Sequence, residues 1–412
     1  MEKRIITWLR GRICTAFIQD GSLVELTLED EDCSVLNRIY VGRVQKVVPG
    51  INAAFIDMGD GVGYYSLTEN RSHLFTDRNR KEGPLRQGDE ILVQISREGV
   101  KTKAPVLTAN LSLPGRLCVV TAGRTGIGFS NKISDSLFKK EAKACLEEAP
   151  LSGFGVIVRT NAYQAGMDAL IKECILLKER LEALIKDAAC RVSGSCLYQP
   201  LPSYITGVRD AYEGRLSSIV TDDRGLYDQL KAYLKEEQPE DLEKLEFYDD
   251  SLLPLYKLYS LETVLDRALG KRVWLKSGGY LVIEPTEAMT VIDVNTGKYE
   301  GRKKMADTIR KINNEAAFTI AAQLRLRNLS GIIMVDFIDM EQEEDKKALL
   351  DCLKQAVSTD PVRTVVVDMT PLGLVELTRK KVRKPLYEQA GQTYDGMRGG
   401  IKTYEDHNCW LR

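Results

Sequence analysis

The stretch between residues 280 and 368 constrains the fold most, because strand and helix patterns alternate along it. The uninterrupted apolar run GIIMVDFIDM, residues 331–340, is typical of a strand buried in a parallel sheet. Around it we predict strands at 280–284, 289–294 and 363–368, and helices at 303–327 and 342–358. Strand–helix–strand connections are right-handed and join parallel strands, so this region predicts an α/β sheet. The first helix should bury one stripe of side chains: Met305, Ile309, Ile312, Ala316, Ile320 and Leu324.

The earlier part of the chain contains a small-barrel pattern. Residues 38–68 are rich in β-branched side chains and carry turn signals, and a further strand is predicted at 90–97. Short strands are predicted within the first 33 residues, and a strand at 155–159 precedes a helix at 162–190. That helix should bury Leu170, Cys174, Leu177, Leu181, Leu184 and Ile185.

Two aspartates end neighbouring predicted strands. Asp293 ends MTVIDVN and Asp336 ends the apolar part of IIMVDFIDM, where α/β sheets place their ligand crevices. Asn295 shares the face of Asp293 because side chains alternate along a strand. Two carboxylates and an amide oxygen suit Mg²⁺, but an aspartate at a strand end also commonly caps a turn. Asp339 is interpreted as the N-cap of the acidic helix that follows, and the alternative is a supporting group behind the two aspartates.

Composition excludes several chemistries. The chain has only two histidines, which argues against a Ser-His-Asp triad or a histidine-rich zinc site. None of its nine cysteines forms a C-x-x-C pair, which indicates reduced thiols in a cytoplasmic protein. The net charge is −1, so a nucleic-acid site must be a local basic surface. We find no signal peptide and no apolar run of membrane-spanning length.

Several motifs, in order along residues 1 to 385, resemble the bacterial ribonuclease E/G family, and most closely its ribonuclease G branch. They are GRVQKVVPGINAAFIDMG, GVIVRTNA, VIDVNTGKYEG, AAQLRLRNLSG, IIMVDFIDM and LGLVELTRKK. The resemblance implies a multidomain α/β (α+β) fold with RNase H-like and DNase I-like layers and an inserted OB-fold barrel of the S1 type. The implied divisions are an RNase H-like domain at 1–34 with 205–268, the OB fold at 35–111, a 5′-end sensor at 112–204, a DNase I-like catalytic domain at 269–390, and a tail at 391–412.

The resemblance also assigns catalytic and sensor residues. Asp293 and Asp336 match the two aspartates that bind Mg²⁺, with Mn²⁺ as the alternative ion, and Asn295 matches the asparagine that supports them. Arg159 and Thr160 match the pair that grips a 5′-monophosphate, and a planar guanidinium suits bidentate binding of phosphate.

RNA-binding positions are implied in two places. Phe55, Tyr64 and Lys103 match the barrel surface, although the family relative has Phe at the second position, and Arg363 matches an arginine near the active site. Aromatic side chains of OB folds stack on the bases of single-stranded RNA. The alternative is that such aromatics are barrel core, and Phe55, in the run AAFI, is the one most open to that interpretation.

The end of the chain departs from the family pattern. The family continues into a C-x-x-C zinc link and a small domain, whereas only Cys409 follows Pro385, with His407 as a further candidate ligand. We therefore expect neither zinc nor the small domain. In the family the zinc link joins two chains, so a homodimer of this chain is an open question. The basic run Arg379, Lys380, Lys381, Arg383 and Lys384 is interpreted either as a track for RNA phosphates or as a solvated helix face.

The sequence thus predicts a metal-dependent endoribonuclease that cleaves single-stranded, A/U-rich RNA to 5′-phosphate and 3′-hydroxyl ends. The resemblance implies that a 5′-monophosphate stimulates the enzyme and that its substrates are rRNA precursors and mRNA. We expect no attachment of the protein to a membrane. The alternative is a non-catalytic RNA-binding module that retains the OB fold and the sensor. The presence of Asp293, Asn295 and Asp336 together favours the enzyme.

Overall fold

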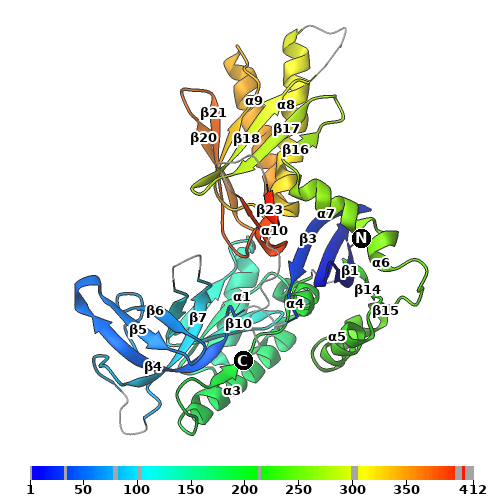
Figure 1. Cartoon of the computed structure of the whole chain (residues 1–412). Coiled ribbons are helices and arrows are strands. Elements are labelled where there is room, and N and C mark those ends of the chain that lie inside the picture. The colour runs from blue at the N-terminus through cyan, green and yellow to red at the C-terminus, as the bar shows by residue number, and fades with distance from the viewer. Residues whose placement is uncertain are drawn as a thin grey trace. The chain divides into compact units, whose positions relative to one another are not determined.

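The computed structural model describes residues 2–31, 35–77, 82–99, 104–211, 215–297, 305–394 and 401–403 (Figure 1). Lys103, His407 and Cys409 therefore lie outside the described residues. The chain forms two compact units, one of residues 1–31 with 216–412 and one of residues 32–215. The finer division into four domains stays a prediction. In the described part of the chain, no helix combines the length and apolarity needed to cross a membrane.

The first unit opens with a five-stranded sheet. Its strands are β1 (Glu2–Leu9), β2 (Arg12–Gln19), β3 (Ser22–Glu29), β14 (Leu216–Thr221) and β15 (Leu245–Phe247), in the order β15-β14-β1-β2-β3. β1 pairs antiparallel with β2 but parallel with β14. The residues of the second unit, 32–215, therefore lie in the sequence between strands that belong to one sheet. The accompanying helices are α5 (Arg224–Glu237), η2 (Pro239–Lys244), α6 (Leu255–Leu258) and α7 (Leu261–Leu269).

The second unit contains a closed barrel. Its strands are β4 (Ile39–Val48), β5 (Ala53–Asp57), β6 (Val62–Ser66), β7 (Glu90–Arg97) and β8 (Val106–Thr108), with the 3-10 turn η1 (Pro49–Ile51) after β4. Pairing of β4 with both β5 and β7 closes the barrel, and β13 (Cys196–Tyr198) pairs with the first two residues of β4. Its core is filled by Tyr40, Tyr65 and aliphatic side chains. The small barrel and the α/β fold class are confirmed.

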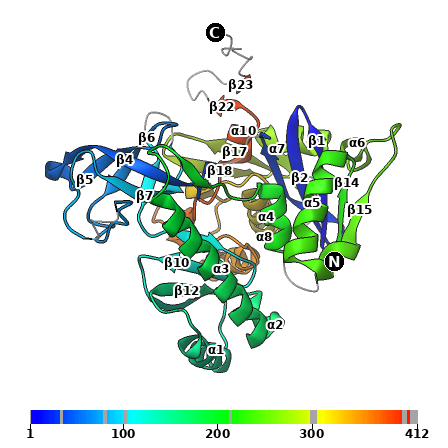
Figure 2. The same cartoon turned by 90° about the horizontal axis from the view of Figure 1, so that it is seen from below.

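The rest of the second unit is a four-stranded sheet covered by helices (Figure 2). Its elements are β9 (Ser112–Pro114), β10 (Cys118–Ala122), β11 (Gly126–Phe129), β12 (Phe154–Val158), α1 (Ser136–Glu148), α2 (Ala162–Ala165), α3 (Met167–Ala188) and α4 (Ser203–Arg209). The predicted helix at 162–190 is broken at Gly166, whose φ of +84° suits glycine. Leu170, Cys174, Leu177 and Leu181 are buried as predicted, whereas Leu184 and Ile185 are half-buried.

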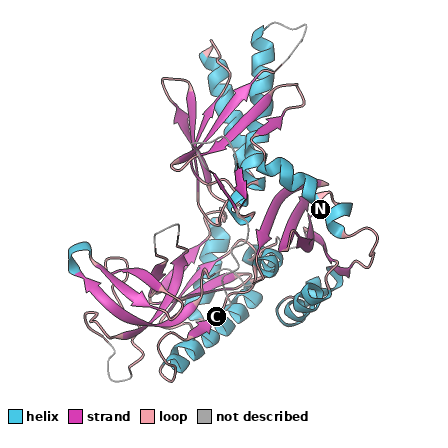
Figure 3. Ribbon diagram, in the orientation of Figure 1, coloured by secondary structure: helices cyan, strands magenta, loops and turns pink. Residues whose placement is uncertain are grey.

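The first unit ends in a six-stranded sheet with α8 (Met305–Leu326) and α9 (Glu343–Ser358) side by side (Figure 3). Its strands are β16 (Arg272–Trp274), β17 (Tyr280–Pro285), β18 (Met289–Asn295), β19 (Gly331–Asp336), β20 (Thr364–Met369) and β21 (Leu374–Arg379), in the order β16-β17-β18-β19-β21-β20. Leucine, isoleucine and valine side chains of the strands form one core with the two helices. The short elements α10 (Leu386–Gln389), β22 (Gln392–Tyr394) and β23 (Ile401–Thr403) follow.

Three expectations for this sheet need correction. β18 and β19 are parallel as predicted, but β21 lies antiparallel between β19 and β20, so the sheet is mixed. β19 is not buried on both faces, since Ile332 is 49% exposed on the face away from the helices. Met305 is 81% exposed, because α8 begins at this residue and only its later turns reach the core.

Candidate active site and RNA-binding surfaces

Asp293 and Asp336 occupy directly opposed positions on neighbouring parallel strands. Asp293 of β18 and Asp336 of β19 are partners in the register of the two strands, and both lie at the carboxyl ends of these strands. Ile292 and Val294 point into the core, so alternation puts Asp293 on the opposite face, where it is half-buried and Asp336 is exposed. The two carboxylates therefore share one open face of the sheet.

Two asparagines fix the geometry of this edge. The Asn295 amide donates to Asp293 Oδ2 at 2.6 Å, which orients that carboxylate. Asn313 of α8 is fully buried, and its side chain both donates to the Ile338 carbonyl (2.8 Å) and accepts from the Ile338 amide (3.1 Å). This pair of bonds fixes the loop that follows Asp336. Asn313 was not identified from sequence, although a polar residue beside the apolar stripe of α8 was a usable signal.

The electrostatics of the pair suit a cation. Partial burial, the neighbouring Asp293 and then Asp339 all raise the pKa of Asp336. A cation between the two carboxylates would offset this repulsion. The described residues contain no cluster of three or more His, Cys, Asp or Glu side chains for a metal. Mg²⁺ typically takes only one or two protein carboxylates and keeps several waters, so the residues present fit that ion.

Asp339 does not cap the following helix, contrary to expectation. α9 begins after Gln342, whose side chain makes no capping hydrogen bond. Asp339 is exposed and lies close enough to Asp336 to affect its pKa. It therefore belongs to the charge environment of the carboxylate pair.

The structure does not bring Arg363 to the carboxylates. Arg363 precedes β20, whose first residue pairs with Arg379, and Arg379 in turn pairs with Gly331 at the start of β19. Asp336 is at the other end of β19, five residues or about 17 Å away along the strand. Arg363 is exposed, and its proposed RNA contact stays a prediction.

The barrel separates its aromatic residues into two groups. Tyr40 and Tyr65 are fully buried core. Phe55 and Tyr64 are directly opposed on β5 and β6, half-buried, with ring centroids 6.1 Å apart in an edge-to-face arrangement. Exposed Lys46 on β4 is paired in register with Phe55. Phe55 is therefore not fully buried in the core, and Lys46, Phe55 and Tyr64 occupy one row of register positions across β4, β5 and β6.

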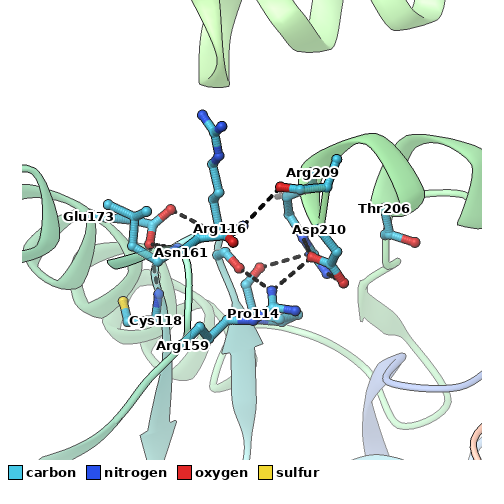
Figure 4. Close-up of polar contacts among 12 residues, drawn as sticks. Pro114, Arg116, Cys118, Arg159, Asn161, Glu173, Thr206, Arg209 and Asp210 are labelled. Atoms are coloured by element: carbon cyan, nitrogen blue, oxygen red, sulfur yellow. Dashed lines mark hydrogen bonds and ion pairs between the residues drawn. The ribbon is translucent and has the colours of Figure 1, made fainter. Parts of the chain in front are cut away.

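Arg159 and Thr160 follow β12 directly, and both are half-buried. Arg159 Nη1 donates to the Gly115 carbonyl (2.6 Å) and to Asp210 Oδ1 (2.8 Å; Figure 4). The same Asp210 oxygen accepts from Arg209 Nε at 2.8 Å. Partial burial acts to raise the pKa of Asp210, but the charges and hydrogen bonds of the two arginines outweigh it and lower that pKa. Within the described residues, all hydrogen bonds of the Arg159 guanidinium leave from Nη1, so Nε and Nη2 are available to a ligand.

Glu173 of α3 braces the loop beside Arg159. Its carboxylate accepts from three successive backbone amides, Arg116 (2.8 Å), Leu117 (2.7 Å) and Cys118 (2.9 Å). The Arg159 amide also donates to the Leu117 carbonyl, so this loop holds both backbone and side chain of the arginine. Neither Glu173 nor Asp210 was identified from sequence, because each partner lies more than 45 residues away along the chain.

The basic run after residue 378 is not a helix face. Arg379 is the last residue of β21 and is 3% exposed, and Arg383 pairs with Glu25 at 2.5 Å. Lys380, Lys381 and Lys384 are exposed. The run thus combines one buried structural arginine with surface charges.

Paired carboxylates on an α/β sheet, in a chain with an inserted OB-type barrel, fit an enzyme that acts on nucleic acid. Residues 112–382 match the model of the ribonuclease E/G family. Ribonuclease G of Salmonella typhimurium (strain SL1344) is 36% identical over 405 residues, 95% of this chain and 82% of that protein, and ribonuclease G of Escherichia coli (strain K12) matches to the same extent. Ribonuclease E of Nostoc sp. is 34% identical over 400 residues, 95% of this chain and 58% of that protein. The chain therefore belongs to the ribonuclease E/G family, which confirms the predicted enzyme class, an endoribonuclease.

Proposed function

We propose that this endoribonuclease is metal-dependent, cleaves single-stranded A/U-rich RNA to 5′-phosphate and 3′-hydroxyl ends, and is stimulated by a 5′-monophosphate. Its substrates would be rRNA precursors and mRNA. The observation that carries the proposal is the direct pairing of Asp293 with Asp336 on the open face of the sheet. Among the described residues no basic side chain forms an ion pair with either carboxylate, and two like charges at adjacent positions favour a bound cation.

Each residue of the site has a defined task. Asp293 and Asp336 would hold Mg²⁺ or Mn²⁺, which when bound supplies an activated water and a Lewis acid for the phosphodiester. Asn295 fixes the rotamer of Asp293 through its 2.6 Å hydrogen bond, which leaves Oδ1 directed away from the amide. Asn313 fixes the loop after β19 and so holds Asp339 within electrostatic reach of Asp336.

Two other surfaces would bind RNA. Phe55 and Tyr64 lie in register with the basic residue Lys46, a combination of aromatic rings that can stack on bases and a cation that can pair with phosphate. Arg159 has Nε and Nη2 available, and Thr160 is adjacent, which supports binding of a terminal phosphate. Lys103 and Arg363 are further candidate contacts to the RNA backbone.

The decisive test is cleavage of a short single-stranded A/U-rich RNA carrying a 5′-monophosphate. We expect internal cuts with Mg²⁺, no cuts with EDTA, and recovery on adding Mg²⁺ or Mn²⁺ in excess. The downstream products should be ligatable through a 5′-phosphate. Tight binding without cutting in Mg²⁺ would overturn the proposal in favour of a non-catalytic RNA-binding module.

Arg159→Ala should abolish the preference for 5′-monophosphate over 5′-hydroxyl RNA. Hydrogen bonds to a charged group are worth about 1.5–3 kcal/mol, so the ratio of kcat/KM values should fall by about tenfold or more towards one. The rate on 5′-hydroxyl RNA should hardly change, because Arg209 still pairs with Asp210 and keeps the local fold.

The matched control is Arg191→Ala, which removes an exposed arginine from the same unit. It should leave the preference intact. A preference that survives Arg159→Ala would mean that the terminal phosphate binds elsewhere.

A further inference from the structure

The hairpin of β16 and β17 carries an aromatic pair with an arginine. Trp274 is directly opposite Tyr280, and their ring centroids are 5.3 Å apart with a 58° angle between planes. The Arg272 guanidinium lies 4.5 Å from the Tyr280 centroid and 5.7 Å from that of Trp274. The three side chains therefore form one cluster, which we call the hairpin platform.

The hairpin platform is on the same face of the sheet as the carboxylates. Tyr280 pairs in register with Asn295, and Val282, which is opposite Arg272, pairs with Asp293. Val273 and Leu281, the alternating neighbours, pack instead into the core formed with α8 and α9. Strands are spaced about 4.8 Å apart, so the backbone of Trp274 is about 10 Å from that of Asn295.

The platform is open to ligands. Trp274 is 64% exposed, although tryptophan is usually largely buried. Arg272 is also exposed, and no acidic side chain of the described residues forms an ion pair with it. An aromatic surface with an unneutralised cation is complementary to a nucleotide, which offers a base to stack and a phosphate to pair.

The hairpin is also held rigidly. Glu315 of α8 accepts from the backbone amides of Lys276 (2.5 Å) and Ser277 (3.1 Å), both in the turn. The Leu275 amide donates to the Gly279 carbonyl at 2.8 Å. These bonds fix the backbone of the turn that follows Trp274, so little backbone ordering is needed on binding.

We propose that Arg272, Trp274 and Tyr280 bind one nucleotide of the single-stranded RNA beside the scissile phosphate, with its base stacked on Trp274. This inference rests on the proposed function, since it assigns a specificity subsite to that active site. Stacking of one base is worth about 1–3 kcal/mol, which corresponds to about 5- to 150-fold in affinity. The gain would appear mainly in Kd and KM, because Trp274 does not touch the reacting atoms.

The test measures RNA binding in EDTA, where no cleavage occurs, by fluorescence anisotropy of a labelled single-stranded RNA. Trp274→Ala should weaken binding about 5- to 150-fold, whereas Trp274→Phe, which keeps a stacking ring, should recover most of it. The control is Leu252→Ala, which removes another highly exposed apolar side chain (91%) of the same unit and should change nothing.

A scan with one abasic ribonucleotide locates the stacked base. In the wild-type protein, one position of the RNA should lose affinity when its base is removed. In Trp274→Ala the same abasic substitution should have no further effect, since the two changes remove one interaction. This coupling is insensitive to a general loss of stability in the alanine variant.

Two results would overturn the proposal. One is an abasic profile that is identical in wild type and Trp274→Ala. The other is unchanged RNA affinity with an altered oligomeric state in sedimentation, which would make the platform a contact between protein chains. Failure of the proposed function would look different from failure of this inference. The wild-type protein would then show no Mg²⁺-dependent cleavage, but the coupling between Trp274→Ala and the abasic substitution could still be measured by RNA binding in EDTA.

Discussion

Asp293→Asn is expected to lower kcat for RNA cleavage by on the order of 10³-fold or more, since a metal site is worth several kcal/mol to the transition state. Asparagine keeps the shape of the side chain but removes the charge that holds the cation. RNA affinity in EDTA should be unchanged or slightly higher, because one negative charge near the phosphates is removed. Single-turnover cleavage and anisotropy measure the two effects separately.

Stability should not fall with this substitution. Asp293 is half-buried, and its charge raises the pKa of Asp336, so the neutral side chain relieves a repulsion. The control is Asp351→Asn on α9, which removes the same negative charge from a well-exposed side chain and should leave kcat unchanged. An Asp293→Asn protein that cuts at the wild-type rate would refute the assignment of the active site.

Asp360→Ala is expected to destabilise the protein by about 3–5 kcal/mol, because it leaves the buried guanidinium of Arg379 without its counter-charge. Arg379 Nε and Nη2 donate to Asp360 at 2.7 and 3.3 Å, and the two side chains are 2% and 6% exposed. Nη1 donates to Asn328 Oδ1 and the Leu329 carbonyl, which tie β21 to the turn before β19. Urea unfolding followed by circular dichroism would measure the loss.

Two further variants sharpen this result. Asp351→Ala breaks a 3.7 Å pair with Lys354 whose members are 65% and 55% exposed, and it should cost less than about 1 kcal/mol. Combining Asp360→Ala with Arg379→Met removes both buried charges and should recover much of the stability. If Asp360→Ala were as mild as Asp351→Ala, the ion pair would not be a significant source of stability.

The carboxylate pair was predictable from sequence because two local rules act together. Alternation puts Asp293 and Asn295 on one face, and a right-handed crossover through α8 brings β19 beside β18. Both rules need only the 48 residues from Met289 to Asp336, and the register confirms their result. The barrel was predictable for a similar reason, since its β-branched runs and turns are consecutive in the chain.

What could not be predicted depends on contacts between distant segments. The insertion of β21 between β19 and β20, which makes the sheet mixed and moves Arg363 one strand further from β19, is indicated by no local pattern. Asp210 and Glu173 became visible only when the fold brought them to Arg159 and its loop. Trp274 was overlooked because β16 has only three residues, although the Ser277-Gly278-Gly279 turn could have indicated its pairing with Tyr280.

The pairing of β1 with β14 has a consequence for synthesis on the ribosome. β1, β2 and β3 are made first, but their sheet stays incomplete until β14 has left the exit tunnel, since Glu2 pairs with Leu216. At roughly 5–20 residues per second, translating residues 32–215 takes on the order of ten seconds or more. The inserted unit is contiguous in sequence and can fold within that time, whereas the three N-terminal strands wait with an unpaired edge. We therefore expect early aggregation or chaperone binding to involve residues 2–29, and the first unit, residues 1–31 with 216–412, to be the last to become resistant to protease.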